Sequence, residues 1–273
     1  IDVTISQIDA CADRDETKVY VSVTDQVQAS VTTLVEDDFE LVETPSGGAE
    51  SPVASKTLEF VDSETIGLSV SLVMDYSQSI LWVDGAVADM ESAAQTFITQ
   101  MNGGDEAEII KYAAERRVMQ AFTADPGLLE AAIKEDPGFS GGSQIYDALE
   151  LAIANLSVRT NERKAVILLT DGREFDSDAT GVGVVAQANA NGISVYTVGF
   201  GDTDPDTLQD LADLTGGIYY ESDDSTALEA IYVKLADLLF QNQYILTYDS
   251  DIAIDNSGEL EVTVDYNGLV GSD

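Results

Sequence analysis

The sequence contains no histidine and only one cysteine among its 273 residues. Without histidine the chain cannot form a Ser–His–Asp triad, an HExxH zinc site or any other histidine-ligated metal centre. Cys11 has no partner for a disulfide within the chain, and a thiolate nucleophile would normally need a histidine beside it. These absences exclude several common classes of hydrolase and soft-metal site.

Long apolar runs and positive charges are also scarce. No run of about 18 apolar residues is present, so we expect no membrane insertion. No signal-peptide pattern begins at Ile1, and we expect a mature secreted protein, an excised region or a cytosolic chain. Lysine and arginine total 12 against 51 acidic residues, a formal charge of −39. Such a surface repels nucleic acid and anionic membranes, and it attracts cations and basic partners. Most of the acidic residues need no further role than to form a solvated surface.

The pattern of apolar residues divides the chain into three segments. Strand patterns fill the first 60 or so residues and return after Gln241, whereas strands alternate with helices between them. The apolar runs "IGLSVSLVM", "KAVILLTDG" and "ISVYTVGFG" are typical of parallel strands covered on both faces. We therefore expect an α/β fold with a doubly wound, mainly parallel, Rossmann-like sheet in residues 63–242. Residues 1–62 and 243–273 should together form a small β-sandwich into which this domain is inserted.

Two local predictions follow from the same patterns. Apolar residues at spacings of three and four, from Val83 to Met101, predict one continuous helix ended by Asn102-Gly103-Gly104. The strands "QYILTYDS" and "ELEVTVDY" flank "DNSG", which predicts a hairpin near the end of the chain.

Oxygen-bearing side chains follow three segments of the α/β region. Asp75 ends its first strand and is followed by Ser77 and Ser79, Asp171 ends another strand, and Ser143 precedes a helix. Because ligands of doubly wound sheets bind beyond the carboxyl ends of the strands, these five residues should meet at one edge. They are all hard oxygen ligands, which favours Mg²⁺, Mn²⁺ or Ca²⁺ over zinc or copper.

Helix capping is a simpler role for part of this set. Short Asp/Ser motifs often cap helices, and capping alone could account for Asp75, Ser77 and Ser79. Asp84 and Asp147 are further acidic candidates, which we expect instead to lie on the surface or to position helices.

The three motifs together resemble those of von Willebrand factor A domains that carry a metal-ion-dependent adhesion site. The resemblance covers about residues 66–241. It rests on Asp75-Tyr76-Ser77-Gln78-Ser79, on Gly141-Gly142-Ser143, where the family usually has threonine, and on Thr170-Asp171-Gly172. "VGFG" and "LTGGIYY", at 198–201 and 214–220, are also similar to the family. The flanking strand patterns resemble bacterial and archaeal surface proteins in which an A domain interrupts a β-sandwich.

The resemblance implies a function in recognition. The metal ion would be held by Asp75, Ser77, Ser79, Ser143 and Asp171, and a Glu or Asp of a partner protein would complete its coordination. No catalysis, nucleic-acid binding or membrane insertion is implied, and self-assembly is a further option. The expected location is extracellular or at the cell surface, with the periplasm as another compartment.

Three alternatives belong to other classes. Two carboxylates and a divalent ion could activate water for hydrolysis, although the sequence offers no clear general base or second metal cluster. The chain could instead be a structural subunit of a surface fibre or layer in which the ion only stabilises. Calcium loops could lie in "DSDIAIDNSGE" or "DTDPD", but Ala253 and Ile254 replace expected loop residues, and helix capping explains the second segment.

Overall fold

The computed structural model describes residues 1–9, 16–26, 30–61, 66–171, 173–201, 203–222, 224–240, 243–250, 252 and 258–273. Cys11, Gly172, Asp202 and residues 251 and 253–257, most of the segment weighed above as an alternative calcium loop, lie outside the described residues. The chain divides into two compact units. Unit 1 comprises Ile1–Ser63 and Gln241–Asp273, and unit 2 comprises Glu64–Phe240.

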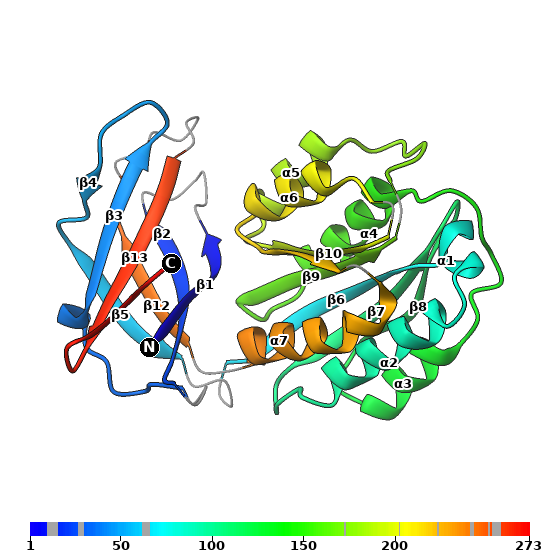
Figure 1. The fold of residues 1–273 in the computed structure, drawn as a ribbon, viewed down its shortest axis with the longest axis horizontal. Helices are drawn as coiled ribbons and strands as arrows, with labels where there is room; N and C mark the ends of the chain where they lie inside the picture. The colour runs from blue at the N-terminus through cyan, green and yellow to red at the C-terminus, as the bar shows by residue number, and fades with distance from the viewer. Residues whose placement is uncertain are drawn as a thin grey trace. The chain divides into compact units, whose positions relative to one another are not determined.

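Unit 2 is a six-stranded sheet with helices on both faces, in the strand order β11-β10-β9-β6-β7-β8 (Figure 1). Only β8 runs antiparallel to its neighbour, so the prediction of an α/β fold with a mainly parallel sheet is confirmed. The strands are β6 Leu68–Asp75, β7 Glu106–Tyr112, β8 Arg116–Thr123, β9 Arg163–Thr170, β10 Ser194–Phe200 and β11 Tyr219–Ser222.

Seven α-helices lie between or after these strands within the described part of the unit: α1 Gln78–Trp82, α2 Ala86–Ile98, α3 Pro126–Lys134, α4 Ile145–Ser157, α5 Gly181–Ala190, α6 Pro205–Asp213 and α7 Leu228–Phe240. Figure 1 shows α2, α3 and α7 on one face of the sheet and α4, α5 and α6 on the other. A separate apolar core fills each interface. Met74, Met90 and Leu235 belong to the first core, and Val73, Leu149 and Leu208 belong to the second.

The order of the strands places a switch point between β6 and β9. After β6 the chain continues to β7 on one side, and after β9 it continues to β10 on the other. The two strands are paired in parallel, with Met74 opposite Leu169. Their carboxyl ends therefore flank the crevice where ligands of doubly wound sheets bind.

The continuous helix predicted from Val83 to Met101 is wrong. Gly85 has a φ of +84° and separates the short α1 from α2. Val83 lies in the connecting turn and is 49% exposed, and Met101 lies beyond the end of α2. Val83 and Val87 keep a helical spacing of four across the break, although Val83 is not part of the buried face.

Unit 1 contains two four-stranded antiparallel sheets, in the orders β1-β2-β12-β5 and β14-β13-β3-β4. Their strands are β1 Asp2–Asp9, β2 Thr17–Thr24, β3 Phe39–Pro45, β4 Ser51–Pro52, β5 Lys56–Val61, β12 Gln243–Tyr248, β13 Gly258–Tyr266 and β14 Leu269–Ser272. Both sheets combine strands from before and after unit 2. Val21 and Leu246 of one sheet and Leu41 and Val262 of the other belong to one apolar core.

The predicted hairpin between β12 and β13 is also wrong. β12 pairs with β2 and β5, whereas β13 pairs with β3 and β14, so the two strands lie in different sheets. A turn pattern reports only that the chain reverses, and the choice of sheet depends on long-range partners.

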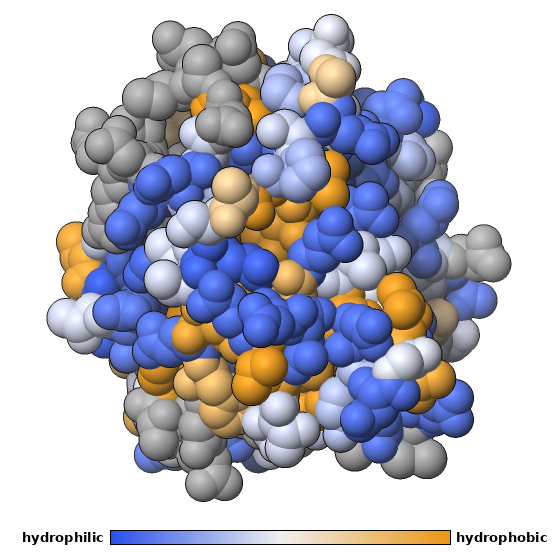
Figure 2. All heavy atoms as spheres, turned by 90° about the vertical axis from the view of Figure 1, so that its left-hand side faces the viewer, coloured by the Kyte–Doolittle hydropathy of each residue, from blue (hydrophilic) through white to orange (hydrophobic). Residues whose placement is uncertain are grey.

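One face of the molecule can be seen to be mainly hydrophilic in Figure 2. Figure 2 shows hydrophilic residues over most of the visible face, with smaller apolar areas between them. This agrees with the 51 acidic residues in the sequence. Among the described residues, no helix has the length and apolarity needed to cross a membrane.

Candidate metal centre

The carboxylate of Asp75 lies at the carboxyl end of β6 and is fully buried. Its Oδ1 accepts a hydrogen bond of 2.7 Å from the backbone N–H of Ser77. Its Oδ2 accepts hydrogen bonds from the hydroxyls of Thr170 at 2.7 Å, Ser143 at 3.0 Å and Tyr112 at 3.2 Å. The hydrogen bond from the backbone N–H of Ser77 turns the chain back toward Asp75 directly after β6, so that Ser77 stays at the edge of the sheet.

Asp171 follows β9 and meets both serines of the first motif. Its Oδ1 accepts hydrogen bonds from Ser79 Oγ at 2.8 Å and from Ser77 Oγ at 3.4 Å. The two serine hydroxyls are themselves 3.0 Å apart. Ser77 and Asp171 are buried, whereas Ser79 is exposed. The arrangement therefore has a buried base and one side open to solvent.

Ser143 reaches this edge on a tightly packed glycine loop. Gly141 has a φ of +137°, and its carbonyl accepts a hydrogen bond of 2.9 Å from the N–H of Gln78. A Cβ atom at Gly142 would lie 2.5 Å from the ring of Phe175, so a side chain there would displace the ring. The two glycines thus let the loop approach both neighbouring segments, and Ser143 Oγ points to Asp75.

The structure therefore brings all five predicted residues together: Asp75, Ser77, Ser79, Ser143 and Asp171 form one connected hydrogen-bond network. Helix capping does not explain the first motif. Ser77 is at the N-cap position of α1, but its side chain makes no capping hydrogen bond.

Sequence reasoning missed two members of the network, Thr170 and Tyr112. Thr170 belongs to the Thr-Asp-Gly motif, and its place at the end of β9 was the available signal. Tyr112 lies opposite Asp75 in the register of β6 and β7, which no local pattern reveals. Both hydroxyls donate to Asp75 and hold its carboxylate in place.

The two further acidic candidates differ from each other. Asp84 is exposed, as expected. Asp147 is buried rather than on the surface, pairs with Arg116 at 2.9 Å, and accepts a hydrogen bond from the N–H of Ala179. Asp147 thus holds Ala179, in the segment that follows Asp171, and its carboxylate contacts Arg116 and Ala179 rather than the network.

Burial shapes the electrostatics of the two carboxylates. Burial raises the pKa of Asp75, and the hydrogen bond from Thr170 is the largest effect in the opposite direction. Burial and the charge of Asp75 raise the pKa of Asp171 to about 6. Two carboxylates that share one network without a cation are costly to ionise, and a bound cation would relieve that cost.

The donor set fits a hard divalent cation. It contains carboxylate and hydroxyl oxygens and no nitrogen or sulfur, the combination suited to Mg²⁺, Mn²⁺ or Ca²⁺. Among the described residues, no group of three or more Asp, Glu, Cys or His side chains could hold a metal ion. A centre at this edge would therefore depend on the serine hydroxyls as much as on the two carboxylates.

Comparison with known families identifies the fold. A model of the von Willebrand factor type A domain matches residues 69–234, more than half of the chain. The chain belongs to this family. The matched region begins in β6 and ends in α7, and it contains every residue of the network.

Three solved structures share the fold at low identity. A proximal thread matrix protein of the mussel byssus, with a zinc-occupied metal-ion-dependent adhesion site, is 19% identical with a TM-score of 0.60; the alignment covers 69% of this chain and 49% of that one. A von Willebrand factor type A protein from Catenulispora acidiphila is 13% identical with a TM-score of 0.57, covering 99% and 70%. The von Willebrand domain of the type V pili tip protein Mfa5 from Porphyromonas gingivalis is 13% identical with a TM-score of 0.50, covering 63% and 94%. This chain thus spans about half the length of the mussel protein.

Proposed function

We propose that this A domain recognises a partner protein through a divalent metal ion held at the switch point of its sheet. The observation that carries the proposal is the convergence of Asp75, Ser77, Ser79, Ser143 and Asp171 in one network with an exposed side. Mg²⁺ is the proposed ion, with Mn²⁺ and Ca²⁺ as alternatives. When bound, the ion supplies a positive centre that attracts a Glu or Asp side chain of the partner.

The residues of this chain divide that task between them. Thr170 and Tyr112 orient Asp75, and the Gly141–Gly142 loop brings Ser143 to it. The three serines would contribute neutral hydroxyl oxygens. These neutral ligands would therefore leave the ion enough positive charge to attract a carboxylate of the partner. We propose no catalytic role for this network. Recognition of this kind suits a protein at the cell surface, where unit 1 would act as a carrier β-sandwich for the A domain.

The proposal is tested by calorimetric titration with Mg²⁺, Mn²⁺ and Ca²⁺. Wild type should bind one ion, Asp75→Ala should not bind, and Ser143→Ala should bind more weakly because water can replace a neutral hydroxyl. Asp206→Asn removes an exposed aspartate from the first turn of α6 and is the matched control for charge. Equal binding by wild type and Asp75→Ala would place the site elsewhere and remove the basis for recognition.

A structural role is the second candidate. It is supported by the similarity to a thread matrix protein of the mussel byssus and to a pili tip protein. In that role the ion would stabilise a subunit of a fibre or layer. If Asp75→Ala abolished capture of a surface partner while self-assembly persisted, recognition would be favoured. If self-assembly of Asp75→Ala failed and no EDTA-sensitive partner of wild type existed, the structural role would be favoured.

A further inference from the structure

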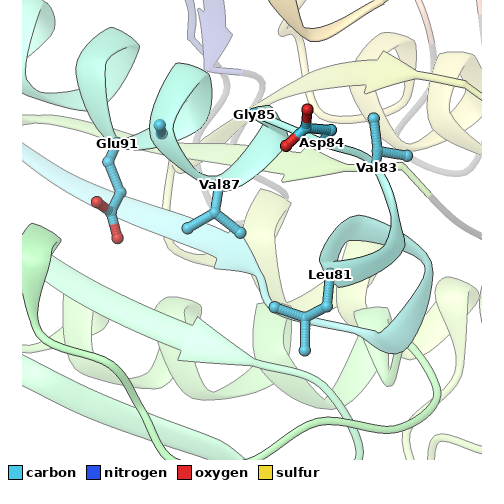
Figure 3. A pocket seen from close by; sticks show the side chains of 7 residues that line it. Leu81, Val83, Asp84, Gly85, Val87 and Glu91 are labelled. Carbon is cyan, nitrogen blue, oxygen red and sulfur yellow. The ribbon is translucent and has the colours of Figure 1, made fainter.

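A pocket of about 370 Å³ lies beside the turn between α1 and α2 in unit 2. Its apolar lining comes from Leu81, Val83 and Val87, and two carboxylates, Asp84 and Glu91, also line it. Figure 3 shows Val87 between Glu91 on one side and Leu81, Val83 and Asp84 on the other. The pocket therefore combines an aliphatic surface with acidic groups at its two sides.

This pocket is joined to the candidate metal centre by short contacts. The N–H of Leu81 donates to the carbonyl of Ser77 at 3.4 Å, so one turn of α1 separates the pocket from that serine. The hydroxyl of Tyr76, the residue between Asp75 and Ser77, donates to Glu91 Oε1 at 2.8 Å. A partner seated at the metal centre would thus have the pocket within reach of a neighbouring side chain.

The charges around the pocket are acidic and incompletely paired. Residues 76–103 contain no lysine or arginine. Asp84 is exposed and makes no hydrogen bond or ion pair with the described residues. Lys111 approaches Glu91 at 3.9 Å, but it is fully buried, and its Nζ donates to the carbonyls of Ile133 and Glu135. Lys111 is therefore held beneath the surface at the end of α3, and the opening of the pocket keeps its negative charge.

We infer that the pocket takes a lysine or arginine side chain. The methylene stem of such a residue packs on Leu81, Val83 and Val87 while its charged end meets the exposed carboxylate of Asp84. Glu91, on the other side of the pocket in Figure 3, adds to the negative potential that attracts it. An acidic side chain would be repelled by the two carboxylates. A purely apolar side chain would displace their water and offer no hydrogen bond in its place, which costs free energy. That the same protein also supplies the metal-bound carboxylate rests on the proposed function. The partner then carries a basic residue near its acidic one.

The sole tryptophan of the sequence provides a local reporter. Trp82 lies between Leu81 and Val83 and is 77% exposed. Its fluorescence is followed while metal-free protein in EDTA is titrated with N-acetyl-lysine-N′-methylamide or the arginine analogue, at about 0.15 M NaCl to screen unspecific attraction. N-acetyl-norleucine-N′-methylamide carries a similar stem without the charge. We expect saturable binding in the millimolar range for the two basic amides and none for the norleucine amide.

Variants locate the response. Asp84→Asn should weaken binding of the lysine amide by up to about fivefold, the effect of losing one exposed ion pair. Asp206→Asn, with an equal loss of charge on α6, should bind like wild type. The inference is overturned if neither basic amide gives a saturable response, if norleucine amide binds equally well, or if Asp84→Asn changes nothing.

The result is separable from the metal centre. Mg²⁺ binding should be unchanged in Asp84→Asn, because Asp84 makes no contact with the network. If wild type fails to bind Mg²⁺ but binds the basic amides in EDTA, the proposed function fails and the basic-side-chain pocket stands. The opposite pair of results leaves the metal centre and removes the pocket.

Discussion

Thr170 Oγ1 donates a 2.7 Å hydrogen bond to Oδ2 of Asp75, across 95 positions of the sequence. The two residues end the adjacent parallel strands β9 and β6, so the bond spans the switch point of the sheet. Burial raises the pKa of Asp75, and this hydrogen bond is the strongest influence that lowers it again. Thr170 is thus a positioning residue for the carboxylate that we propose to hold the metal.

Thr170→Val should weaken Mg²⁺ binding in a pH-dependent way. The variant keeps the shape of the side chain but removes the donor, so the pKa of Asp75 rises further and protons compete better with the ion. We expect a loss of about fivefold to thirtyfold near pH 6, from a charge-assisted hydrogen bond worth roughly 1–2 kcal/mol, and a smaller loss near pH 8. Calorimetry at both pH values measures it. Thr170→Ser, which keeps the hydroxyl, is the control, and an equal loss at both pH values would contradict the mechanism.

Asp171→Asn should stabilise the metal-free protein above pH 6. The pKa of Asp171 is raised to about 6 by burial and by the charge of Asp75. A carboxyl with a raised pKa favours the folded state below its ordinary pKa, near 4, and loses that contribution as the pH rises to about 6. The variant avoids this loss and should be more stable at pH 7.5 by on the order of 1 kcal/mol, with little difference at pH 4.

Thermal unfolding in EDTA and in Mg²⁺ tests this prediction. In EDTA the variant should unfold at the higher temperature, whereas in millimolar Mg²⁺ wild type should gain stability and the variant should gain little. If the variant were less stable than wild type in EDTA at pH 7.5, the two carboxylates would not be repelling each other as the network implies.

The parts of this site that follow from sequence are those fixed by strand direction. Asp75 and Asp171 end apolar strands, and parallel strands bring their carboxyl ends to one edge, so their meeting was predictable. Tyr112 was not, because its contact depends on the register of β6 and β7. The break at Gly85 was missed because apolar spacing continues across it, and the separation of β12 from β13 depends on partners early in the chain.

Buried polar residues in β6 and β7 were also beyond sequence patterns. Ser69 and Ser71 lie inside an apparently apolar strand, and their hydroxyls donate to Glu106 and Glu108 at 2.6 and 2.7 Å. Their burial depends on α4, which supplies Asn155 as a second donor to Glu108. Local periodicity cannot show that a carboxylate of the next strand satisfies these serines.

Glu108→Gln should remove a pH dependence of stability between about pH 4.5 and 7. Burial raises the pKa of Glu108 to about 7 despite hydrogen bonds from Ser71 and Asn155. Because the folded-state pKa is raised, stability is highest below pH 4.5 for this group and falls as the pH rises through 7. Glutamine can accept from Asn155 and donate to Ser71 Oγ, so the variant should be more stable at pH 8 by on the order of 2 kcal/mol.

The control for this variant lies two residues away on the same strand. Glu106 is paired with Arg159 at 2.5 Å, and despite burial its pKa is lowered by hydrogen bonds from Arg159 and Ser69. Glu106→Gln should therefore destabilise the protein at neutral pH, the opposite sign to Glu108→Gln. Denaturant unfolding at pH 5 and pH 8 measures both. Equal signs for the two variants would show that burial does not control Glu108.

Ionic strength and specific metal binding should stabilise the protein by separable amounts. A net charge of −39 repels itself, and salt at about 0.15 M screens charges beyond roughly 8 Å, so NaCl should raise the melting temperature. This effect does not depend on the metal centre and should be the same in wild type and in Asp75→Ala.

Millimolar Mg²⁺ added at constant ionic strength should raise the melting temperature further only in wild type, because only wild type binds the ion at the network. Scanning calorimetry of both proteins in EDTA, in NaCl and in NaCl with Mg²⁺ gives the two contributions. An equal response of both proteins to Mg²⁺ would mean that the ion only screens the acidic surface, and a melting temperature unaffected by NaCl would mean that the charges are spread too widely to matter.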